Sequence, residues 1–347
     1  MPNRSETLML ALAVFTVACN GEAALEPRTP GFPAAAVAVP RAGSFTVTVY
    51  PVDGWFADVN RANLIVGMAN GRAIALPRGG SIKIMSSGSR ITGKAVAVNN
   101  NGMIAGAVSP NCCAWVDLSP AVWPSYSATP VVLPDSGEAA DVNDRGLVVG
   151  TVLRRGRARA FAWDVPTGSV VLLPTLPGGR VTTARAINNE QVILGTAEDA
   201  KGLTSTVLWR QGATGWTVQP VGGGIDGLDI DAWLGIVGAT AARASYGKPD
   251  HAGWFTTQGA SYAEAVSPNG TLAVGTDYGA ATTWPQTNIG FVADKGGSIT
   301  WLPFPANGGP WRASFGSGVT DCGLVVGKVY ELGSVFTAEP AVWDPGC

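Results

Sequence analysis

The chain has 347 residues, of which 46 are glycine and 24 are proline, and only 14% are charged. With 46% hydrophobic residues, this composition is typical of a turn-rich all-β protein and argues against a disordered chain. The formal net charge of −2 gives no basis for a general affinity for nucleic acid or anionic membranes. The single histidine, His251, excludes metal sites built from several histidines.

Residues 1–19 have the character of an export signal. The apolar run 8–17 is too short to cross a bilayer as a mature helix. Residues 16–19 read TVAC and resemble the lipobox of bacterial lipoproteins, although Thr16 stands where leucine is usual. The resemblance implies that Cys19 becomes the lipidated first residue; an ordinary secretory signal cut nearby is the alternative. Either way we expect a protein of the cell envelope, lipid-anchored at the outer membrane or cell surface, or secreted.

Residues 20–43 are expected to form a linker. They contain four prolines and many alanines, a composition that argues against a packed element. The folded domain is therefore predicted to span residues 44–347, with the linker tethering it to the lipid anchor, which is its only expected contact with a membrane.

The region 44–347 repeats one hairpin seven times, and the clearest copy is Asp141–Gly150, with the sequence DVNDRGLVVG. In each copy a β-branched residue precedes a short polar residue that opens a turn, and a glycine closes the following apolar run. The separations between copies average about 43 residues, a period typical of propeller repeats. The turn-opening residues are Asn60, Asn99, Asn143, Asn188, Asp231, Ser267 and Thr320, and the closing glycines are Gly67, Gly106, Gly150, Gly195, Gly238, Gly275 and Gly327.

The third unit shows four strands, at about residues 139–143, 147–153, 158–164 and 169–174. The last unit has no room for a fourth strand, whereas a spare strand, residues 44–50, precedes the first unit. We therefore predict an all-β, seven-bladed β-propeller of about four strands per blade, whose ring is closed by this N-terminal strand. The fifth unit has little space for a fourth strand. Tryptophans that end the third strands are expected to pack between blades: Trp123, Trp163, Trp209, Trp254 and Trp343.

The units resemble the bacterial extracellular HAF-repeat proteins. The matching residues of the third unit are Asn143 to Gly150 and then Ala160-Phe161-Ala162-Trp163. Only the fifth unit keeps the histidine of the repeat name, as His251-Ala252. The resemblance implies a secreted propeller-like repeat protein and carries over no catalytic residue.

Long, variable loops are expected on the rim opposite the uniform turns. They carry aromatic and arginine side chains, which are common in binding faces on rigid scaffolds. Scattered surface aromatics without a function are the alternative. The candidate ligand-binding residues are Trp115, Arg157, Tyr246, His251, Trp284 and Trp311, and the same loops carry Tyr278, Phe315 and Tyr330.

Two further sets of residues follow from the predicted topology. Cys322 and Cys347 should lie on one rim and form a disulfide, while Cys112 and Cys113 are either a strained vicinal pair or free thiols. Three aspartates occupy the same place in three inner strands and could converge on the channel to hold a cation, although capping strands or contacting water is the simpler interpretation. These aspartates are Asp58, Asp141 and Asp229.

No catalytic set and no cofactor motif emerges from the sequence. We expect a surface-tethered binding or scaffold module, monomeric, with a glycan or an envelope protein as partner and without nucleic acid. The alternatives are a propeller hydrolase or lyase that uses channel carboxylates, and a purely structural envelope protein. Raised pKa values around a pocket at the three aspartates would favour the enzyme.

Overall fold

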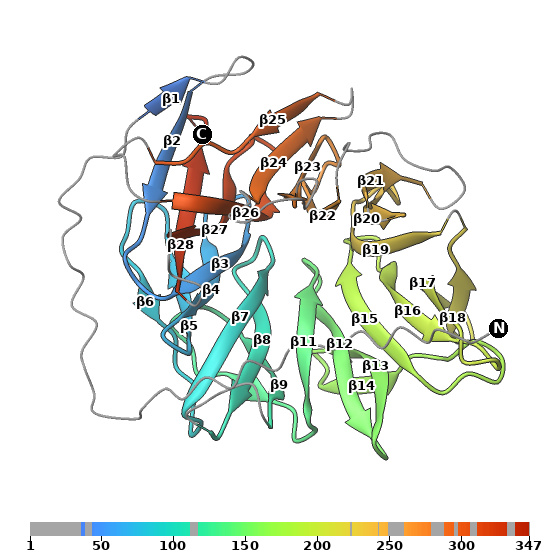
Figure 1. The fold of residues 1–347 in the computed structure, drawn as a ribbon. Helices are drawn as coiled ribbons and strands as arrows, with labels where there is room; N and C mark the ends of the chain where they lie inside the picture. The colour runs from blue at the N-terminus through green and yellow to red at the C-terminus, as the bar shows by residue number, and fades with distance from the viewer. Residues whose placement is uncertain are drawn as a thin grey trace, which may run out of the picture.

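The structure is a computed structural model. It describes residues 44–111, 117–222, 224–241, 243–248, 260–278, 288–294, 298–305, 311–331 and 337–346, with residues 36–38, 311, 312 and 331 described by their backbone alone. These residues form seven β-sheets that stand as blades around a central axis (Figure 1). The predicted seven-bladed β-propeller is confirmed. Within the described ranges no helix has the length and apolarity needed to cross a membrane.

Blades 1 to 4 each contain four antiparallel strands, which follow one another in chain order from the innermost strand at the axis to the outermost strand. Blade 1 holds β3 (Gly54–Val59), β4 (Ile65–Ala69), β5 (Arg72–Leu76) and β6 (Lys83–Ile84). Blade 2 holds β7 (Thr92–Val98), β8 (Ile104–Ser109), β9 (Ser119–Trp123) and β10 (Val131–Val132). Blade 3 holds β11 (Gly137–Val142), β12 (Leu147–Arg154), β13 (Arg157–Asp164) and β14 (Ser169–Leu172). Blade 4 holds β15 (Thr182–Ile187), β16 (Ile193–Glu198), β17 (Thr204–Gly212) and β18 (Gly215–Pro220).

Blades 5 to 7 are less regular. The described part of blade 5 has three strands, as its short repeat unit suggested, whereas blade 7 has five. Blade 5 holds β19 (Ile225–Ile230), β20 (Ile236–Thr240) and β21 (Arg243–Gly247). Blade 6 holds β22 (Ser261–Val266), β23 (Leu272–Asp277), β24 (Ile289–Asp294) and β25 (Ile299–Trp301). Blade 7 holds β26 (Trp311–Val319), β27 (Val325–Glu331), β28 (Ala338–Asp344), β2 (Ser44–Val49) and β1 (Ala36–Ala38).

The N-terminal strand closes the ring. β2 pairs antiparallel with β28, with Val47 opposite Trp343, so the first and last parts of the domain share blade 7 (Figure 1). Phe45 and Val47 are buried against the core of that blade. The predicted closing strand is confirmed, and it covers an edge that the C-terminal strand would otherwise leave unpaired.

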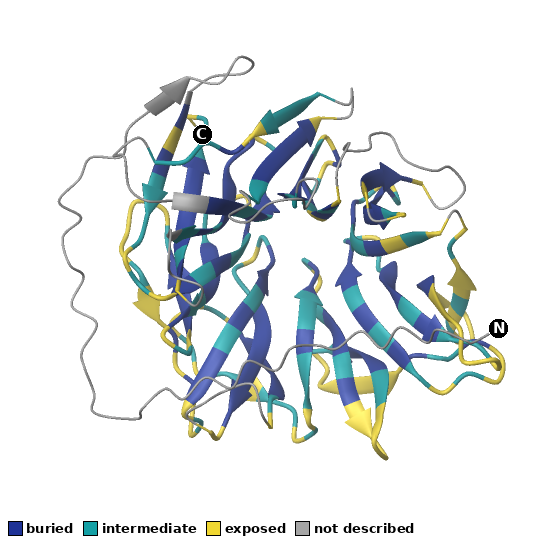
Figure 2. Cartoon of the chain, viewed as in Figure 1, coloured by how far each residue is buried: buried dark blue, intermediate teal, exposed yellow. Residues whose placement is uncertain are grey.

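Tryptophan side chains join blades 2, 4 and 7 to the preceding blade. Trp123, Trp209 and Trp343 are fully buried, and the indole N–H of each donates to a backbone carbonyl of the preceding blade. The acceptors are the carbonyls of Ser86 (2.6 Å), Pro174 (2.8 Å) and Pro303 (2.8 Å). The predicted core role of these tryptophans is confirmed, because burial of the ring is combined with a satisfied N–H. Figure 2 shows the contrast between this buried interior and exposed outer strands such as β14.

Every inner strand carries a β-bulge, and the closing glycine of the repeat lies against it. In blade 3, a Cβ on Gly150 would overlap the carbonyl oxygen of Glu138 and come within 2.9 Å of the Phe161 ring. The same overlap, with the carbonyl of the facing inner strand, occurs at the closing glycine of all seven blades. The repeated glycine is therefore required by a close approach of two backbones.

Candidate functional site at the two ends of the channel

The predicted loop residues divide into those outside the described residues and those that the structure places. Trp115, His251 and Trp284 lie outside the described residues, as does the side chain of Trp311. Arg157 is exposed at the start of β13 on blade 3, as expected for a residue near a loop.

The prediction for Tyr246 as a loop residue that contacts ligand is wrong. Tyr246 lies in β21 with 2% of its surface exposed. Its hydroxyl contacts the carboxylate of Asp231 and lies 2.9 Å from the carbonyl oxygen of Gly270 in blade 6. The residue joins blades 5 and 6. β21 also ends at Gly247, so the expected third strand ending at Trp254 is displaced, and Trp254 itself lies outside the described residues.

Of the five cysteines, only Cys322 belongs to the described residues. It lies in the turn of blade 7, with its Sγ 3.1 Å from the hydroxyl of Thr320, and it is disulfide-bonded. Its predicted partner, Cys347, lies outside the described residues, so the pairing stays a prediction. Cys19, Cys112 and Cys113 also lie outside the described residues.

The seven inner-strand turns form one rim of the molecule, here called the turn rim. Its first five turns are linked by four asparagine side chains. The Nδ2 of Asn60 donates to the carbonyl of Asn99 (2.9 Å), Asn99 to Asn143 (2.8 Å), Asn143 to Asn188 (3.2 Å) and Asn188 to Asp231 (2.9 Å). We call these bonds the asparagine ladder. The Oδ1 atoms of Asn60, Asn99 and Asn143 each accept two backbone N–H groups of their own turn, and the Oδ1 of Asn188 accepts the N–H of Val192.

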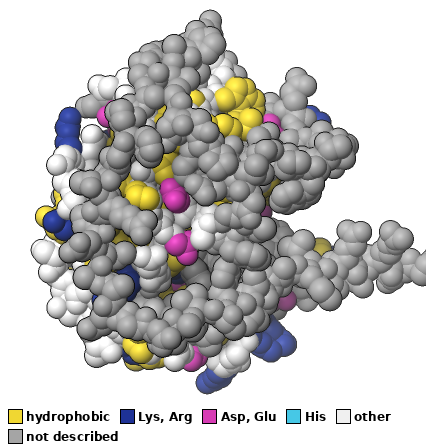
Figure 3. Space-filling view, turned by 60° about the vertical axis from the view of Figure 1, so that its left-hand side comes forward, with side chains coloured by type: hydrophobic (Ala, Val, Ile, Leu, Met, Phe, Trp, Pro, Cys, Tyr) yellow, Lys and Arg dark blue, Asp and Glu magenta, His cyan; other side chains and the backbone are white. Residues whose placement is uncertain are grey.

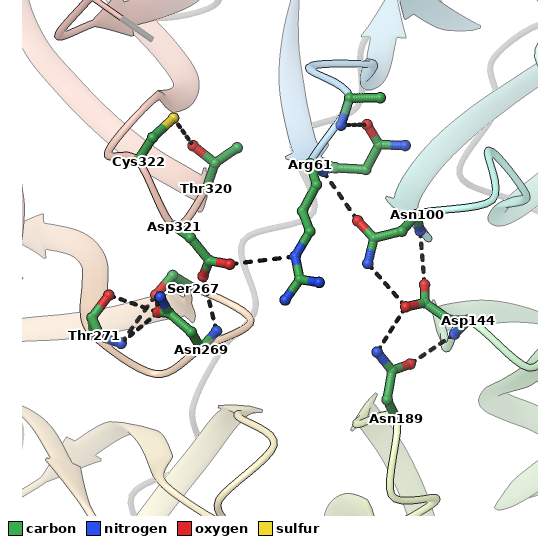
Figure 4. A network of polar contacts seen from close by, with 12 residues as sticks. Arg61, Asn100, Asp144, Asn189, Ser267, Asn269, Thr271, Thr320, Asp321 and Cys322 are labelled. Carbon is green, nitrogen blue, oxygen red and sulfur yellow. Dashed lines mark hydrogen bonds and ion pairs between the residues drawn. The ribbon is translucent and has the colours of Figure 1, made fainter.

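A second polar layer surrounds the ladder at the turn rim (Figure 4). Asp144 accepts hydrogen bonds from Asn100 and Asn189 of the two neighbouring blades, at 2.8 to 2.9 Å. Arg61 continues the layer by an ion pair of 3.3 Å with Asp321 in blade 7. This layer joins blades and leaves few polar groups for a ligand.

The three aspartates of the inner strands also join blades. The Oδ1 of Asp58 accepts the N–H of Val59 in its own strand (2.7 Å), and the Oδ2 accepts the N–H of Val98 in the next blade (2.8 Å). Asp141 and Asp229 repeat this geometry toward blades 4 and 6. The three carboxylates thus accept hydrogen bonds from six backbone N–H groups. The simpler interpretation, that these aspartates satisfy strand N–H groups, fits this geometry.

The environment of these carboxylates raises their pKa values. Burial raises the pKa of Asp58 to about 7 and that of Asp229 to about 6, against the opposing effect of their backbone hydrogen bonds. Burial, together with the charge of Asp229, raises the pKa of Asp141 well above its usual range. All three residues are partly exposed, so water screens part of this effect.

A cavity of about 130 Å³ lies on the axis at the turn rim, lined by Asp58 and Asp229 together with turn residues of the surrounding blades. Small-molecule sites usually have volumes of about 300 to 1,000 Å³. The cavity therefore has room for a few waters rather than a sugar. Among the described residues, no group of three histidine, cysteine, aspartate or glutamate side chains is arranged to hold a metal ion, which does not support the cation site considered for the aspartates.

The opposite end of the inner strands, here called the loop rim, presents a different ring of side chains. One residue of each inner strand, five positions before the turn-opening residue, is at least partly exposed, whereas the residue after it is buried. The residues of this loop-rim ring are Trp55, Lys94, Glu138, Thr183, Asp226, Tyr262 and Phe315. The closing glycine of each blade lies against the carbonyl of its ring residue, which fixes the backbone from which the side chain projects.

Three neighbouring blades, 6, 7 and 1, contribute aromatic residues to the ring, and two tyrosines at the ends of second strands extend the cluster. Tyr278 makes edge-to-face contacts with Tyr262 (6.1 Å between ring centroids) and Phe315 (6.3 Å), and Phe315 contacts Tyr330 (5.4 Å). We call these four residues and Trp55 the aromatic arc. All five are partly exposed, so rings held by one another also reach solvent.

Three of the other four ring residues are charged, the fourth being Thr183, and each charge has a partner. Lys94 forms an ion pair with Glu138 (2.5 Å), and Arg185 forms one with Asp226 (2.6 Å). Figure 3 shows one face of the molecule, on which the described hydrophobic, acidic and basic side chains are interspersed.

Two further charged groups lie at the aromatic arc. The Nζ of Lys328 lies 5.2 Å from the ring centre of Phe315, 5.4 Å from Tyr330 and 5.8 Å from Trp55. Burial raises the pKa of Glu264, and the positive charges of Lys328 and Arg185 oppose that rise. Burial raises the pKa of Tyr278 as well, so its hydroxyl is a neutral donor at pH 7.

The sequence analysis assigned Tyr278, Phe315 and Tyr330 to loops of this rim. They do lie at the loop rim, but Phe315 and Tyr330 belong to β26 and β27 and not to loops. Trp55 and Tyr262, in β3 and β22, were not predicted. The signal was present in the repeat register, because the ring position can be read five residues before each turn.

Comparisons with known proteins identify the fold. No model of a known protein family matches the chain, and no curated protein matches it. Solved structures do, in 69 chains. They include U3-55K (TM-score 0.55, 9% identity, 88% of this chain and 100% of that chain) and the β-propeller domain of the Trilobed protease from Pyrococcus furiosus (0.53, 11%, 84% and 93%). They also include the acylaminoacyl peptidase of Pyrococcus horikoshii (0.54, 10%, 84% and 51%), of which the chain spans about half. At these identities the likeness is one of fold alone.

Proposed function

We propose that this propeller is a binding module that takes a saccharide at the aromatic arc. The observation that carries the proposal is the convergence of five partly exposed aromatic rings from blades 6, 7 and 1 at one end of the inner strands. Sugar rings expose C–H groups on their faces, and aromatic side chains supply large contact areas at a low entropy cost. Polar groups beside the rings, such as the Tyr278 hydroxyl, can orient a polar ligand.

The test is binding to an array of soluble oligosaccharides, followed by calorimetric titration of the sugars that bind. Tyr278→Ala should weaken binding at least about tenfold, as truncation of a central aromatic contact does. Trp233→Ala is the matched control, because Trp233 is 67% exposed at the turn rim. Equal weakening by both variants, or a loss of binding explained by a fall in melting temperature, would overturn the proposal. If no oligosaccharide on the array bound but an envelope protein was captured, the partner would be a protein. If neither an oligosaccharide nor a protein bound, a structural role would be favoured.

A second candidate function uses the channel carboxylates as an acid and a base. The raised pKa values of Asp58 and Asp229 at the axial cavity favour it, whereas the small volume and the two backbone N–H groups bound by each carboxylate oppose it. A panel of polysaccharide hydrolase and lyase assays with Asp58→Asn and Asp229→Asn decides between them. Turnover by the wild type that both variants abolish would support the enzyme.

The proposed location is the bacterial cell envelope, with a lipid on Cys19, and the repeats are proposed to be of the HAF type. The lipobox-like residues 16–19 and the proline-rich segment 20–43 support the anchor. Metabolic labelling with a clickable fatty acid should mark the wild type and leave Cys19→Ala unlabelled. Labelling of both proteins, or of neither, would contradict lipidation at this residue.

A further inference from the structure

The charges at the loop rim do not all have partners. Lys94 and Arg185 each lie within 2.6 Å of a carboxylate oxygen. Among the described residues, no carboxylate lies within ion-pair distance of Lys328. Within the described part of the chain, Lys328 is therefore the basic group beside the aromatic arc that has no ion pair, so its ammonium can still donate to a ligand.

The surroundings of Lys328 increase the strength of any contact that it makes. Its Nζ lies over three rings, two on its own blade and Trp55 on blade 1. Rings and neighbouring strands exclude part of the solvent, and a charge acts more strongly in a medium of lower dielectric constant. Lys328 stands directly across the strand pair from Phe315, on the residue after the closing glycine Gly327, so its backbone is held in place.

Glu264 and Arg185 are the other charged groups near Lys328 that influence the electrostatics of the aromatic arc. Both Lys328 and Arg185 interact with the Glu264 carboxylate, and Arg185 is itself engaged by Asp226. Glu264 lies at the bulge of β22; the residue is exposed as a whole, although its surroundings desolvate the carboxylate enough to raise its pKa. Lys328 is itself partly exposed, so a ligand can reach it. These four charges sum to zero, so a negative ligand would be drawn by the Lys328 ammonium itself, which has no ion pair within the described residues, and not by a surplus of positive charge.

We infer that the saccharide bound at the aromatic arc is acidic, with a carboxylate that pairs with Lys328 while a sugar ring packs on Tyr278 and the neighbouring rings. The inference rests on the proposed function and specifies its ligand class. A charge-assisted bond from ammonium to carboxylate is stronger than a neutral one, and it distinguishes an acidic sugar from a neutral sugar of the same shape.

The experiment compares two probes that differ only in charge: an oligogalacturonate and its methyl ester, titrated into the full chain by calorimetry. The wild type should bind the acid at least about tenfold more tightly than the ester, and added salt should lower the affinity for the acid but not the affinity for the ester. Lys328→Met keeps roughly the length of the side chain and removes its charge. It should make the two affinities equal by lowering the affinity for the acid. Lys328→Arg should keep the preference, and Glu264→Gln should strengthen acid binding by removing a competing charge.

The outcomes separate this inference from the proposed function. Equal binding of acid and ester by the wild type, with both lost in Tyr278→Ala, would overturn the acidic ligand and leave the saccharide site in place. A preference for the acid that survives in a folded Lys328→Met would also overturn the inference, because another cation would then be responsible. Failure of both probes to bind the folded wild type would overturn the inference of an acidic saccharide ligand. The oligosaccharide array would then show whether the aromatic arc binds any saccharide.

Discussion

Blades 1 to 4 and blades 5 to 7 join their neighbours by different chemistry at the same place. In the first group the turns open with asparagine, whose amide donates across to the next blade. The turns of blades 5 to 7 open with Asp231, Ser267 and Thr320, which have no amide to donate. There the tyrosine hydroxyl of blade 5 and the carboxylate of Asp321 make the contacts between blades.

The division at the turn rim is matched at the loop rim. The aromatic arc belongs to blades 6, 7 and 1, whereas the paired charges belong to blades 2 to 5. Two of the three aromatic blades are thus among those that depart from the asparagine pattern. A shared structural task keeps the copies alike, so the blades that depart from the repeat are the more informative place to search for a ligand site.

The closing glycine should be indispensable in both groups of blades. In Gly150→Ala the new methyl group would overlap the Glu138 carbonyl oxygen, and in Gly275→Ala that of Tyr262. We expect each to lower the free energy of unfolding by about 3 kcal/mol or more, measured by urea denaturation. Gly212→Ala is the control, because its new Cβ would meet only the Gly215 carbonyl oxygen, at 3.6 Å. A cost below about 1 kcal/mol for the first two variants would refute the close-approach explanation.

The asparagine ladder should distinguish the two groups. Asn143→Asp keeps the acceptor for its own turn but replaces the Nδ2 donor with an oxygen facing the Asn188 carbonyl. We expect a loss of about 2 kcal/mol, since a buried acceptor would lose its partner. Asn70→Asp, at an exposed hairpin position, should change stability little. If the two variants behaved alike in chemical denaturation, the ladder would have no measurable role.

The channel aspartates should give stability a pH dependence. The pKa of Asp58 is about 7 in the folded state against an ordinary value of 3.8, so between these values the folded state binds more protons than the unfolded state. The free energy of unfolding should therefore fall as the pH rises from about 4 to about 7, less steeply than the full shift implies because water reaches the carboxylate. Asp58→Asn should flatten this slope in denaturation curves recorded at several pH values. Asp229→Asn should flatten it over a window that ends near its own pKa of about 6. A slope unchanged in both variants would show that other groups cause it.

The ion pair that crosses from blade 7 to blade 1 should matter least. Arg61 is 57% exposed, and its Nε lies 3.3 Å from the Asp321 carboxylate. We expect Arg61→Ala to cost less than about 1 kcal/mol, and added salt should reduce even that cost. A larger effect in a thermal melt would mean that the outer polar layer contributes more than the ladder beneath it.

The sequence was sufficient for the architecture because each blade repeats its own local signals. A turn opened by Asn143 and closed at Gly150 indicates a hairpin, and the spare strand at residues 44–50 indicates how the ring closes. The ladder was not foreseen, because an amide that spans two blades is invisible in a turn considered by itself. The interchange of Asn with Asp, Ser and Thr looked like turn chemistry alone, and it also marks where the ladder stops.

The candidate site was only partly predictable for a related reason. Tyr246 was assigned to a variable loop, but packing drew it into a strand between two blades. Trp55 and Tyr262 were overlooked because strand residues were assumed to be structural. Proximity across the ring depends on which side of a bulge each residue occupies, and a single sequence does not state this.

The three channel aspartates alternate with small residues around a ring whose number of blades is odd. Going round the axis, the position reads Asp58, Ala97, Asp141, Ala186, Asp229, Ala265 and Gly318, so acid and small residue alternate. Each acid accepts hydrogen bonds in two blades, and a ring of seven cannot complete such an alternation. The mismatch falls where blade 6 meets blade 7, because Ala265 and Gly318 are both small, and a Cβ on Gly318 would lie 3.0 Å from the Asp58 backbone. In hydrogen bonding, the unit of this channel is thus a pair of blades joined by one aspartate, and blade 7 is the single blade that such a pair does not include.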